Sequence, residues 1–364
     1  MFMYWGRRGA LTRFSLDLAN EVVGKLNGVT ISVSRDSSSF DEFARLGRHV
    51  FPVSTFTTNL GAVLNAWTIP RLCSDLRRRL IEDQTRAVVD LMPHVWSPII
   101  APVVRSTGAR YVPIIHDADP HPGDRTTAVK RWLDHAIDHA DMVLTLSGAV
   151  SGRLEALGRI PRNKIVTLFH PDLNYGTTPA IRKPPQKGAP ARLLFMGRIM
   201  DYKGLPLFLD AVELLKENGT NVEVGVFGEG QLDASAARLK ALNAEVVNRW
   251  LSDDEIGAVL TRFDIMVLSH VEASQSGVAA AAFGAGLPVV ATPVGGLIEQ
   301  VLDGRSGVLA IRADAISLSE AIEDLALNPL LYGSICANIA ATREERSMAR
   351  FAKVCIANVL RSAD

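Results

Sequence analysis

The sequence predicts an α/β protein with two domains, each built on a parallel sheet. The chain has 364 residues, and this length favours two domains of about 150 or more residues each. Short apolar segments alternate with amphipathic segments of helical period, as in βαβ units. A Pro-rich stretch at 170–191 lacks this pattern, and the alternation restarts after it. We therefore expect an N-terminal domain at 1–175, a linker at 176–191, a second domain at 192–345 and a final helix in 346–364 that can pack across both.

Composition narrows the function classes. Hydrophobic residues make up 48% of the chain and charged residues 21%, which is enough apolar material for a full core. Lys plus Arg equals Asp plus Glu at 39 each, whereas a dedicated nucleic-acid binder normally carries a basic surplus. Three widely spaced cysteines and the lack of a signal-like N-terminus or a long unbroken apolar run predict a cytoplasmic protein without a Cys metal cluster or a membrane span.

The N-terminal domain opens with a βαβ pattern. We expect a strand at Phe2–Trp5, a helix from about Thr12 to Leu26 and a strand at Val29–Val33. The loop Gly6-Arg7-Arg8-Gly9 follows the first strand. Two arginines in a glycine loop can hold an anion, and a solvated turn explains them equally well. Further strands are expected at Ala87–Leu91, Tyr111–Ile115, Met142–Leu146 and Ile165–Phe169.

A segment at 57–83 joins an apolar half to a basic half. Residues 1–80 carry eleven Lys or Arg against six Asp or Glu. A basic face beside apolar residues can rest on an anionic bilayer, although a solvated helix face is the more usual reason for such a pattern. The sequence therefore allows two interpretations of this segment: a solvated helix face, and peripheral contact with the inner face of a membrane.

His116 stands directly after the apolar strand expected at 111–115. A neutral imidazole at this end of a strand lies where α/β sheets present their ligands. Asp117 and Asp119 come next, and two carboxylates one residue apart can share a divalent cation. Asp beside Pro and Gly is also an ordinary turn former, so metal binding is the weaker interpretation.

In the second half, a segment of small residues at 271–296 follows a buried strand at 264–269 and contains the next one at Leu287–Ala291. Ser274 or Ser276 can cap an Ala-rich helix that ends near Gly284. The first N–H groups of such a helix have no partner within it and carry the positive end of the helix dipole, so a phosphate can bind there. Small-residue turns also join strands to helices in proteins without a phosphate site. Other elements expected in this half are strands at Leu193–Met196, Val222–Phe227 and Gly307–Leu309, a helix at Leu205–Glu217 and a capping box at Ser252–Glu255.

Three motifs occur in register: G-R-I-M-D-Y-K-G at 197–204, then G-E-G-Q-L and N-R-W-L-S-D-D-E-I within 228–256, then E-A-S-Q-S-G-V and G-L-P-V-V-A-T-P-V-G-G-L-I-E within 272–299. Together they resemble the family-4 retaining glycosyltransferases of the GT-B fold, and most closely bacterial members of polysaccharide or lipid-linked saccharide assembly. The stretch H-D-A-D-P-H-P-G-D at 116–124 is similar to an H-D-x-x-P-H-P-G stretch of those relatives. The resemblance implies two Rossmann-like domains facing across a cleft, with the nucleotide-sugar donor on the C-terminal domain and the acceptor on the other.

The resemblance also assigns residues. In the family, an Arg and a Lys at the positions of Arg198 and Lys203 hold the donor diphosphate. Two fixed cations can stabilise the departing nucleoside diphosphate, so neither a metal nor a cofactor is implied. Glu272 would position the sugar, and His116 would line the acceptor side near the anomeric carbon, with the Gly6-Arg7-Arg8-Gly9 loop nearby. The remaining donor contacts implied by the resemblance are Arg249 and Leu251 near the base and Ser276, Gly277 and Val278 around the phosphates.

One position departs from the family. Its members usually carry a second glutamate eight positions after the first, where it contacts the ribose. Counting from Glu272, this sequence has Ala280 there, or Ala281 if the loop shifts the register by one. The ribose contact therefore has no assigned residue.

The sequence thus predicts a metal-independent retaining glycosyltransferase that moves a hexosyl unit from a nucleotide diphosphate sugar to a saccharide or lipid-linked acceptor. Two alternatives stay open. A sugar-nucleotide epimerase of the same fold needs no acceptor, and a non-catalytic protein can bind a nucleotide sugar without reacting it. The sugar, the base, the acceptor and the linkage are not specified by the sequence.

Overall fold

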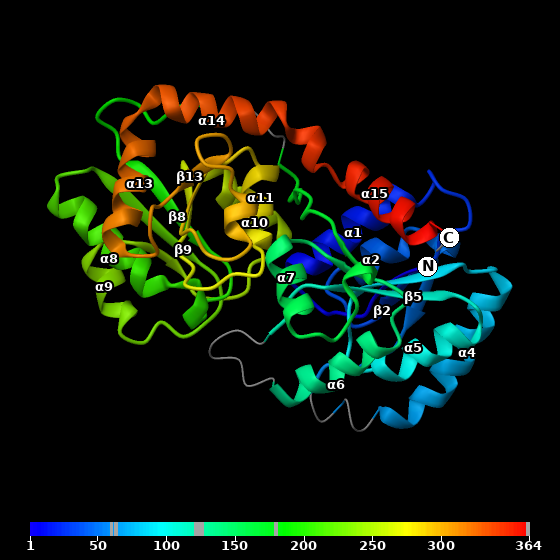
Figure 1. Ribbon diagram of the computed structural model, residues 1–364. Coiled ribbons are helices and arrows are strands. Elements are labelled where there is room, and N and C mark those ends of the chain that lie inside the picture. Colours follow the sequence, from blue (N-terminus) through cyan, green and yellow to red (C-terminus); the bar gives the residue numbers. More distant parts are fainter. Residues whose placement is uncertain (59–60, 62–64, 120–126, 178–180, 362–364) are drawn as a thin grey trace. The chain divides into compact units, whose positions relative to one another are not determined.

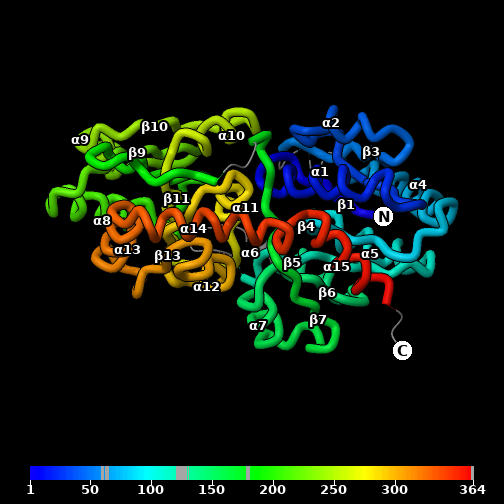
Figure 2. The backbone as a smooth tube through the Cα atoms, turned by 90° about the horizontal axis from the view of Figure 1, so that it is seen from above, coloured from blue at the N-terminus to red at the C-terminus, as the bar shows by residue number. Residues whose placement is uncertain are grey.

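The computed structural model describes residues 1–58, 61, 65–119, 127–177 and 181–361. The chain divides into two α/β units (Figures 1 and 2). Of the described residues, unit 1 holds 1–119, 127–171 and 348–361, and unit 2 holds 172–177 and 181–347. The predicted pair of Rossmann-like α/β domains is confirmed.

In the described part of unit 1, seven strands form a parallel sheet in the order β3-β2-β1-β4-β5-β6-β7. The strand order reverses between β1 and β4, which makes this the switch point where open α/β sheets bind ligands. The strands are β1 (Phe2–Tyr4), β2 (Ile31–Ser34), β3 (Val50–Val53), β4 (Ala87–Met92), β5 (Arg110–Ile115), β6 (Val143–Thr145) and β7 (Ile165–Thr167). The α-helices are α1 (Ala10–Val22), α2 (Phe40–Ala44), α4 (Ile69–Glu82), α5 (Ser97–Ser106), α6 (Thr127–Asp138), α7 (Gly148–Ala156) and α15 (Met348–Leu360).

The core of unit 1 lies on both faces of this sheet. Central strands such as β4 and β5 are apolar at nearly every position, because helices cover both of their faces. Met3, Val88 and Tyr111 belong to one buried cluster. On α15, Phe351 packs edge-to-face on Phe14 of α1, with ring centroids 5.2 Å apart. The last helix of the chain therefore completes the core of unit 1 (Figure 2).

In the described part of unit 2, six strands form a parallel sheet in the order β10-β9-β8-β11-β12-β13. Its switch point lies between β8 and β11. The strands are β8 (Ala191–Met196), β9 (Val222–Phe227), β10 (Glu245–Val247), β11 (Ile265–Leu268), β12 (Val289–Ala291) and β13 (Gly307–Leu309). The α-helices are α8 (Leu205–Glu217), α9 (Ser235–Ala241), α10 (Asp253–Arg262), α11 (Gly277–Gly284), α12 (Leu297–Gln300), α13 (Ala315–Leu327) and α14 (Pro329–Ala341).

Local sequence accounts for most of these elements. Helix α8 has the predicted bounds and buries one apolar stripe that includes Phe208 and Val212. The capping box at the start of α10 is present, with Ser252 and Glu255 bonding each other's main-chain N–H. Helix α1 is shorter than predicted, because the chain is already extended at Val23.

The chain passes from unit 1 to unit 2 between Pro171 and Asp172, before the linker expected at 176–191. Much of that Pro-rich stretch is fixed to unit 2. The guanidinium of Arg182 donates to the carbonyls of Phe263 at 2.8 Å and Leu260 at 2.5 Å, near the end of α10. Residues 181–191 are therefore part of unit 2 rather than a free connection.

Candidate functional site

Loops at the carboxyl ends of the unit 2 strands converge next to the switch point between β8 and β11. The loop after β8 lies against the loop after β9, where the Ile199 N–H donates to the Glu229 carbonyl at 2.9 Å. The Gly230 N–H in turn bonds Asn248 after β10, at 3.0 Å. An open α/β sheet holds its ligand at this place, and two of the predicted donor motifs meet there.

Lys203 lies in a short 3₁₀ turn, η4 (Asp201–Lys203), that is bound to the loop after β11. Gly204 follows with φ of 67°, and a Cβ at this position would stand 1.9 Å from the Ser269 carbonyl oxygen. Only glycine permits this approach. The Ser269 hydroxyl donates to the Lys203 and Gly204 carbonyls at 3.1 and 2.9 Å. The Lys203 backbone is therefore fixed to the end of β11.

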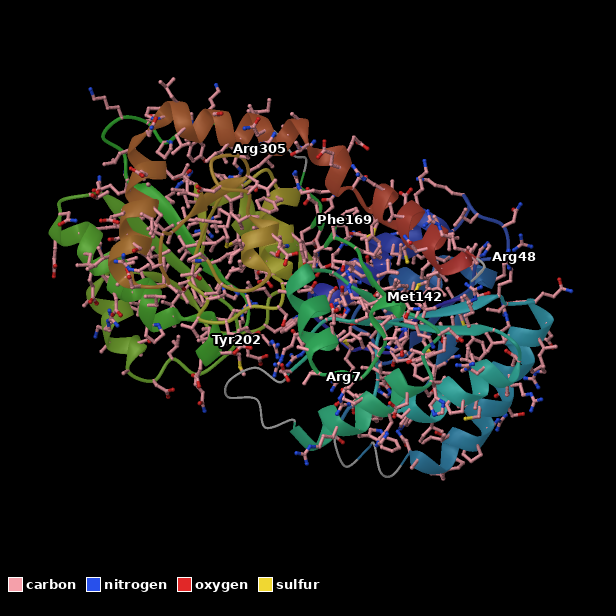
Figure 3. The ribbon with its side chains drawn as sticks, in the orientation of Figure 1. Arg7, Arg48, Met142, Phe169, Tyr202 and Arg305 are labelled. Atoms are coloured by element: carbon pink, nitrogen blue, oxygen red, sulfur yellow. The ribbon has the colours of Figure 1, made fainter. Side chains whose placement is uncertain are left out.

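Lys203 is only 8% exposed, and its Nζ lies 2.8 Å from Nε2 of His270. It also lies 5.3 Å from the ring centroid of Tyr202, a residue labelled in Figure 3. Desolvation makes a buried cation costly unless polar groups or an anion meet it. His270, two positions before Glu272, was missed by the sequence analysis.

Arg198 is exposed, and the structure gives it no hydrogen bond or ion pair with any of the residues it describes. It follows Gly197, whose Cα approaches the side chain of Val278 in the first turn of α11. An exposed guanidinium on the loop that also carries Lys203, with no acidic partner among the described residues, can receive a polyanion.

The N-terminus of α11 is built as the sequence predicts, with Ser276 as its N-cap. The Ser276 hydroxyl accepts from the Ala279 N–H at 3.3 Å. Gln300 of α12 holds the same residue from outside. Its Oε1 accepts from the Ser276 N–H and its Nε2 donates to the Ser276 carbonyl, both at 2.9 Å. Gly277 and Val278 then begin the helix, and their N–H groups are the ones an anion can reach.

The other predicted donor residues have different surroundings. Glu272 is exposed in the loop after β11. Arg249 is exposed and pairs with Glu255, whose pKa this arginine and Ser252 lower to about 2. Leu251 is buried. The two alanines at the place of the second glutamate, Ala280 and Ala281, are buried in α11.

In unit 1, His116 lies at the carboxyl end of β5 and is buried. Its Nε2 lies 2.7 Å from the Leu91 carbonyl of β4, so Nε2 carries the proton and Nδ1 is the acceptor in the neutral ring. Burial lowers the pKa of His116, although its hydrogen bond to Leu91 and the charge of Asp117 oppose the shift. The lowered pKa keeps His116 neutral at pH 7, as the sequence analysis expects.

Asp119, one of the two carboxylates considered for a metal, pairs with Arg153 of α7. No group of three or more His, Cys, Asp or Glu side chains that could hold a metal ion occurs among the described residues. The rest of the predicted H-D-A-D-P-H-P-G-D stretch, residues 120–124, lies outside the part of the chain that the structure describes.

The loop Gly6-Arg7-Arg8-Gly9 connects β1 to α1 at the switch point of unit 1. The Arg7 guanidinium donates to the Thr57 carbonyl, and the Arg7 carbonyl accepts from the Ser38 N–H at 2.7 Å. Figure 3 labels Arg7. The arginine is thus engaged by its own unit, which fits the solvated-turn interpretation as well as an anion site.

The basic segment expected at 57–83 forms α4 over its second half. Leu76 and Leu80 face the core, while Arg78 pairs with Asp75 on the solvent side at 2.8 Å. Trp67, just before the helix, is 79% exposed. Among the helices the structure describes, none has the length and apolar character needed to cross a membrane. Contact with a membrane surface stays a prediction.

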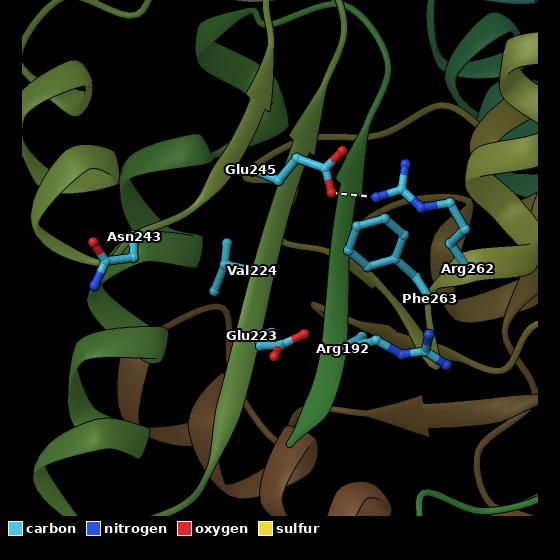
Figure 4. A pocket seen from close by; sticks show the side chains of 7 residues that line it. All are labelled: Arg192, Glu223, Val224, Asn243, Glu245, Arg262 and Phe263. Carbon is cyan, nitrogen blue, oxygen red and sulfur yellow. Dashed lines mark hydrogen bonds and ion pairs between the residues drawn. The ribbon is translucent and has the colours of Figure 1, made fainter. Parts of the chain in front are cut away.

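A hollow of about 300 Å³ lies at the opposite, amino end of the unit 2 sheet (Figure 4). Its charged lining is largely paired: Arg262 bonds Glu245, and Arg192 bonds Asp264 at 2.7 Å. Parallel sheets bind ligands at their carboxyl ends, so this hollow is separate from the converging donor loops.

Comparison with known proteins identifies the chemistry. Residues 190–328 match the family described as "Glycosyl transferases group 1". The chain is 28% identical over 342 residues to the 2-deoxystreptamine glucosyltransferase of Streptomyces kanamyceticus, covering 86% of this chain and 85% of that protein. The chain is a glycosyltransferase.

This glycosyltransferase also resembles other known proteins. It is 29% identical over 207 residues to the glycogen synthase of Mycobacterium tuberculosis, covering 56% of this chain and 49% of that protein, so it matches about half of that synthase. The fold is similar to that of Anabaena Alr3699/HepE, solved in complex with UDP and glucose. The TM-score is 0.74 at 14% identity over 99% and 98% of the two chains.

Proposed function

We propose that this glycosyltransferase is retaining and independent of metal, and that it moves a hexosyl unit from a nucleotide diphosphate sugar to a saccharide acceptor. The observation that carries the proposal is that the loop after β8 holds both the exposed Arg198, next to Gly197 at the first turn of α11, and the buried Lys203. Two cations and free helix N–H groups at one switch point suit a diphosphate.

The chemistry follows from the leaving group. As the bond between the anomeric carbon and the diphosphate breaks, negative charge grows on the departing oxygen. Lys203, already fixed and desolvated, stabilises this charge without reorganising, and Arg198 adds a second cation. The acceptor oxygen forms its bond to the same carbon, and its proton passes to the departing diphosphate. In this proposal the cations do the work of a divalent ion.

The remaining roles are assigned by position. Glu272, on the loop after β11, would contact the sugar. In unit 1, His116 and the Gly6-Arg7-Arg8-Gly9 loop are the candidates for the acceptor side. In the neutral His116 ring Nε2 donates to the Leu91 carbonyl, so the lone pair lies on Nδ1. A lipid-linked acceptor would suit a chain that rests on a membrane surface, and Trp67 beside α4 is the exposed residue to test.

The test is a transfer assay with UDP-glucose, GDP-mannose and ADP-glucose, each with and without a panel of glycoside acceptors. We expect release of nucleoside diphosphate only with an acceptor, a product of retained anomeric configuration by NMR, and full activity in excess EDTA. An epimerised donor formed without acceptor would favour the epimerase. Donor binding without any turnover would favour a non-catalytic role, an inverted product would reject retention, and loss of activity in EDTA with recovery on adding Mn²⁺ would reject metal independence.

A further inference from the structure

The contact between Lys203 and His270 indicates a role for His270 that the sequence motifs do not predict. An ammonium has three hydrogens and no lone pair, so at 2.8 Å the imidazole Nε2 must accept. His270 is itself 2% exposed, and its ring meets Tyr202 edge-to-face at 6.3 Å. The contact therefore fixes the ammonium from one side.

The backbone around His270 is held as firmly as its ring. Its carbonyl accepts from the Thr292 hydroxyl at 2.5 Å, and the next N–H, of Val271, donates to the Tyr202 carbonyl at 2.9 Å. The imidazole thus comes from a rigid segment between β11 and Glu272. A flexible lysine side chain loses rotamer freedom when it is ordered, and a prior contact removes that cost from ligand binding.

We propose that His270 is a positioning residue that holds the Lys203 ammonium in place for the donor diphosphate. This rests on the proposed function, because it takes Lys203 as a diphosphate ligand. The role requires an acceptor atom at position 270 and not a charge. Glutamine, whose amide oxygen can accept, should replace histidine, whereas leucine should not.

The experiment compares the affinity for a nucleoside diphosphate with that for its nucleoside, by calorimetry. The probes are UDP with uridine, ADP with adenosine and GDP with guanosine. The ratio of the two dissociation constants isolates what the diphosphate contributes. We expect a preference of at least about tenfold for the diphosphate in the wild type, most of it lost in Lys203→Ala. If the wild type shows no preference for any pair, the donor-site proposal fails and the role of His270 fails with it, whereas the variants below test the role of His270 alone.

His270→Leu should lose nearly the same preference as Lys203→Ala, with nucleoside affinity unchanged. His270→Gln should keep the preference for the diphosphate within about threefold of the wild type. The double variant Lys203→Ala/His270→Leu should show no smaller preference than Lys203→Ala alone, because the effects of coupled residues are not additive. The proposal is wrong if His270→Leu loses nucleoside and diphosphate affinity equally, or if His270→Gln does not keep the preference for the diphosphate. It is also wrong if the losses of Lys203→Ala and His270→Leu add in the double variant. If His270→Leu unfolds by melting temperature, His270→Phe replaces it, since Phe keeps the ring against Tyr202 without an acceptor.

Discussion

The carboxylate of Asp172 lies 3.0 Å from the guanidinium of Arg346, and the Asp172 N–H donates to the Arg346 carbonyl at 2.8 Å. Both residues belong to unit 2, and each stands at one of the two points where the chain changes unit. Burial raises the pKa of Asp172 to about 6, although Arg346 opposes the shift. An ion pair and a main-chain bond therefore hold both ends of unit 2 together.

Replacing Arg346 by Met should lower the free energy of unfolding of unit 2 by about 2–4 kcal/mol, because it leaves the Asp172 carboxylate buried without its cation. The double variant Asp172→Asn/Arg346→Met should recover part of this loss. Urea unfolding of both variants gives the measurement. A double variant no more stable than Arg346→Met would mean that the Arg346 bonds to the end of α14, and not the charge pair, account for the effect.

Removing either donor cation should slow transfer. Arg198→Ala or Lys203→Ala is expected to lower kcat/KM at least tenfold, consistent with about 1.5–3 kcal/mol for a charge-assisted contact. Arg305→Ala is the matched control, since Arg305 is an exposed arginine before β13, at the amino end of the sheet (Figure 3). Near-normal rates in both site variants would contradict the assignment.

The amide of Gln300 should matter to donor binding although it lies outside the predicted motifs. Gln300→Ala removes two neutral hydrogen bonds to Ser276, each worth about 0.5–1.5 kcal/mol, so the α11 N-terminus should loosen. We expect donor affinity to fall about threefold to thirtyfold. Gln300→Glu keeps the acceptor but sets a carboxylate against the Ser276 carbonyl, and should be at least as weak. Unchanged donor affinity in both variants would show that phosphate binding at the α11 N-terminus does not need the hydrogen bonds between Gln300 and Ser276.

His116→Ala should affect both stability and rate, because the structure shows a buried ring bonded to Leu91. Leaving that carbonyl unpaired costs about 1–3 kcal/mol. His116→Gln keeps an N–H donor and should preserve more of the melting temperature. Transfer should fall at least about a hundredfold in both, with donor affinity retained. Normal turnover of folded His116→Gln would make His116 a core residue only.

The buried carboxyl of Asp90 should make the free energy of unfolding decrease as pH rises. This fully buried carboxyl on β4 accepts from Ser97 and Tyr111, yet burial raises its pKa to about 6. Its folded-state pKa exceeds the unfolded value near 3.8, so its contribution is greatest below pH 4 and is lost between about pH 4 and 6. Relative to wild type, Asp90→Asn should gain about 3 kcal/mol of unfolding free energy from pH 4 to pH 7. If the free energies of unfolding of the wild type and Asp90→Asn change with pH in parallel, the prediction is wrong.

Local pattern was enough to predict α8, β9 and the caps of α10 and α11, because burial, period and capping residues agree there. Strands β3 and β10 were not predicted. Both are short, and their side chains are largely exposed or half-buried at the edge of a sheet, so no apolar run marks them.

The candidate site was only partly predictable for a different reason. Arg198, Lys203 and Ser276 follow from motifs within one segment each. The contacts of His270 with Lys203 and of Gln300 with Ser276 join residues 67 and 24 positions apart. The first pair exists only once the sheet order places β8 beside β11, and the second only once β11 lies beside β12, which no local spacing specifies.

Helix α15 gives unit 1 an unusual dependence on the order of synthesis. A chain leaves the ribosome N-terminus first, and domains generally fold as they emerge. Unit 2 is complete once Ser347 has appeared, but the core of unit 1 still lacks Phe351 and the fully buried Cys355. The half of the protein that is translated first is therefore the last that can finish folding, and a nascent chain stalled before Met348 would carry a finished unit 2 and an open groove along α1.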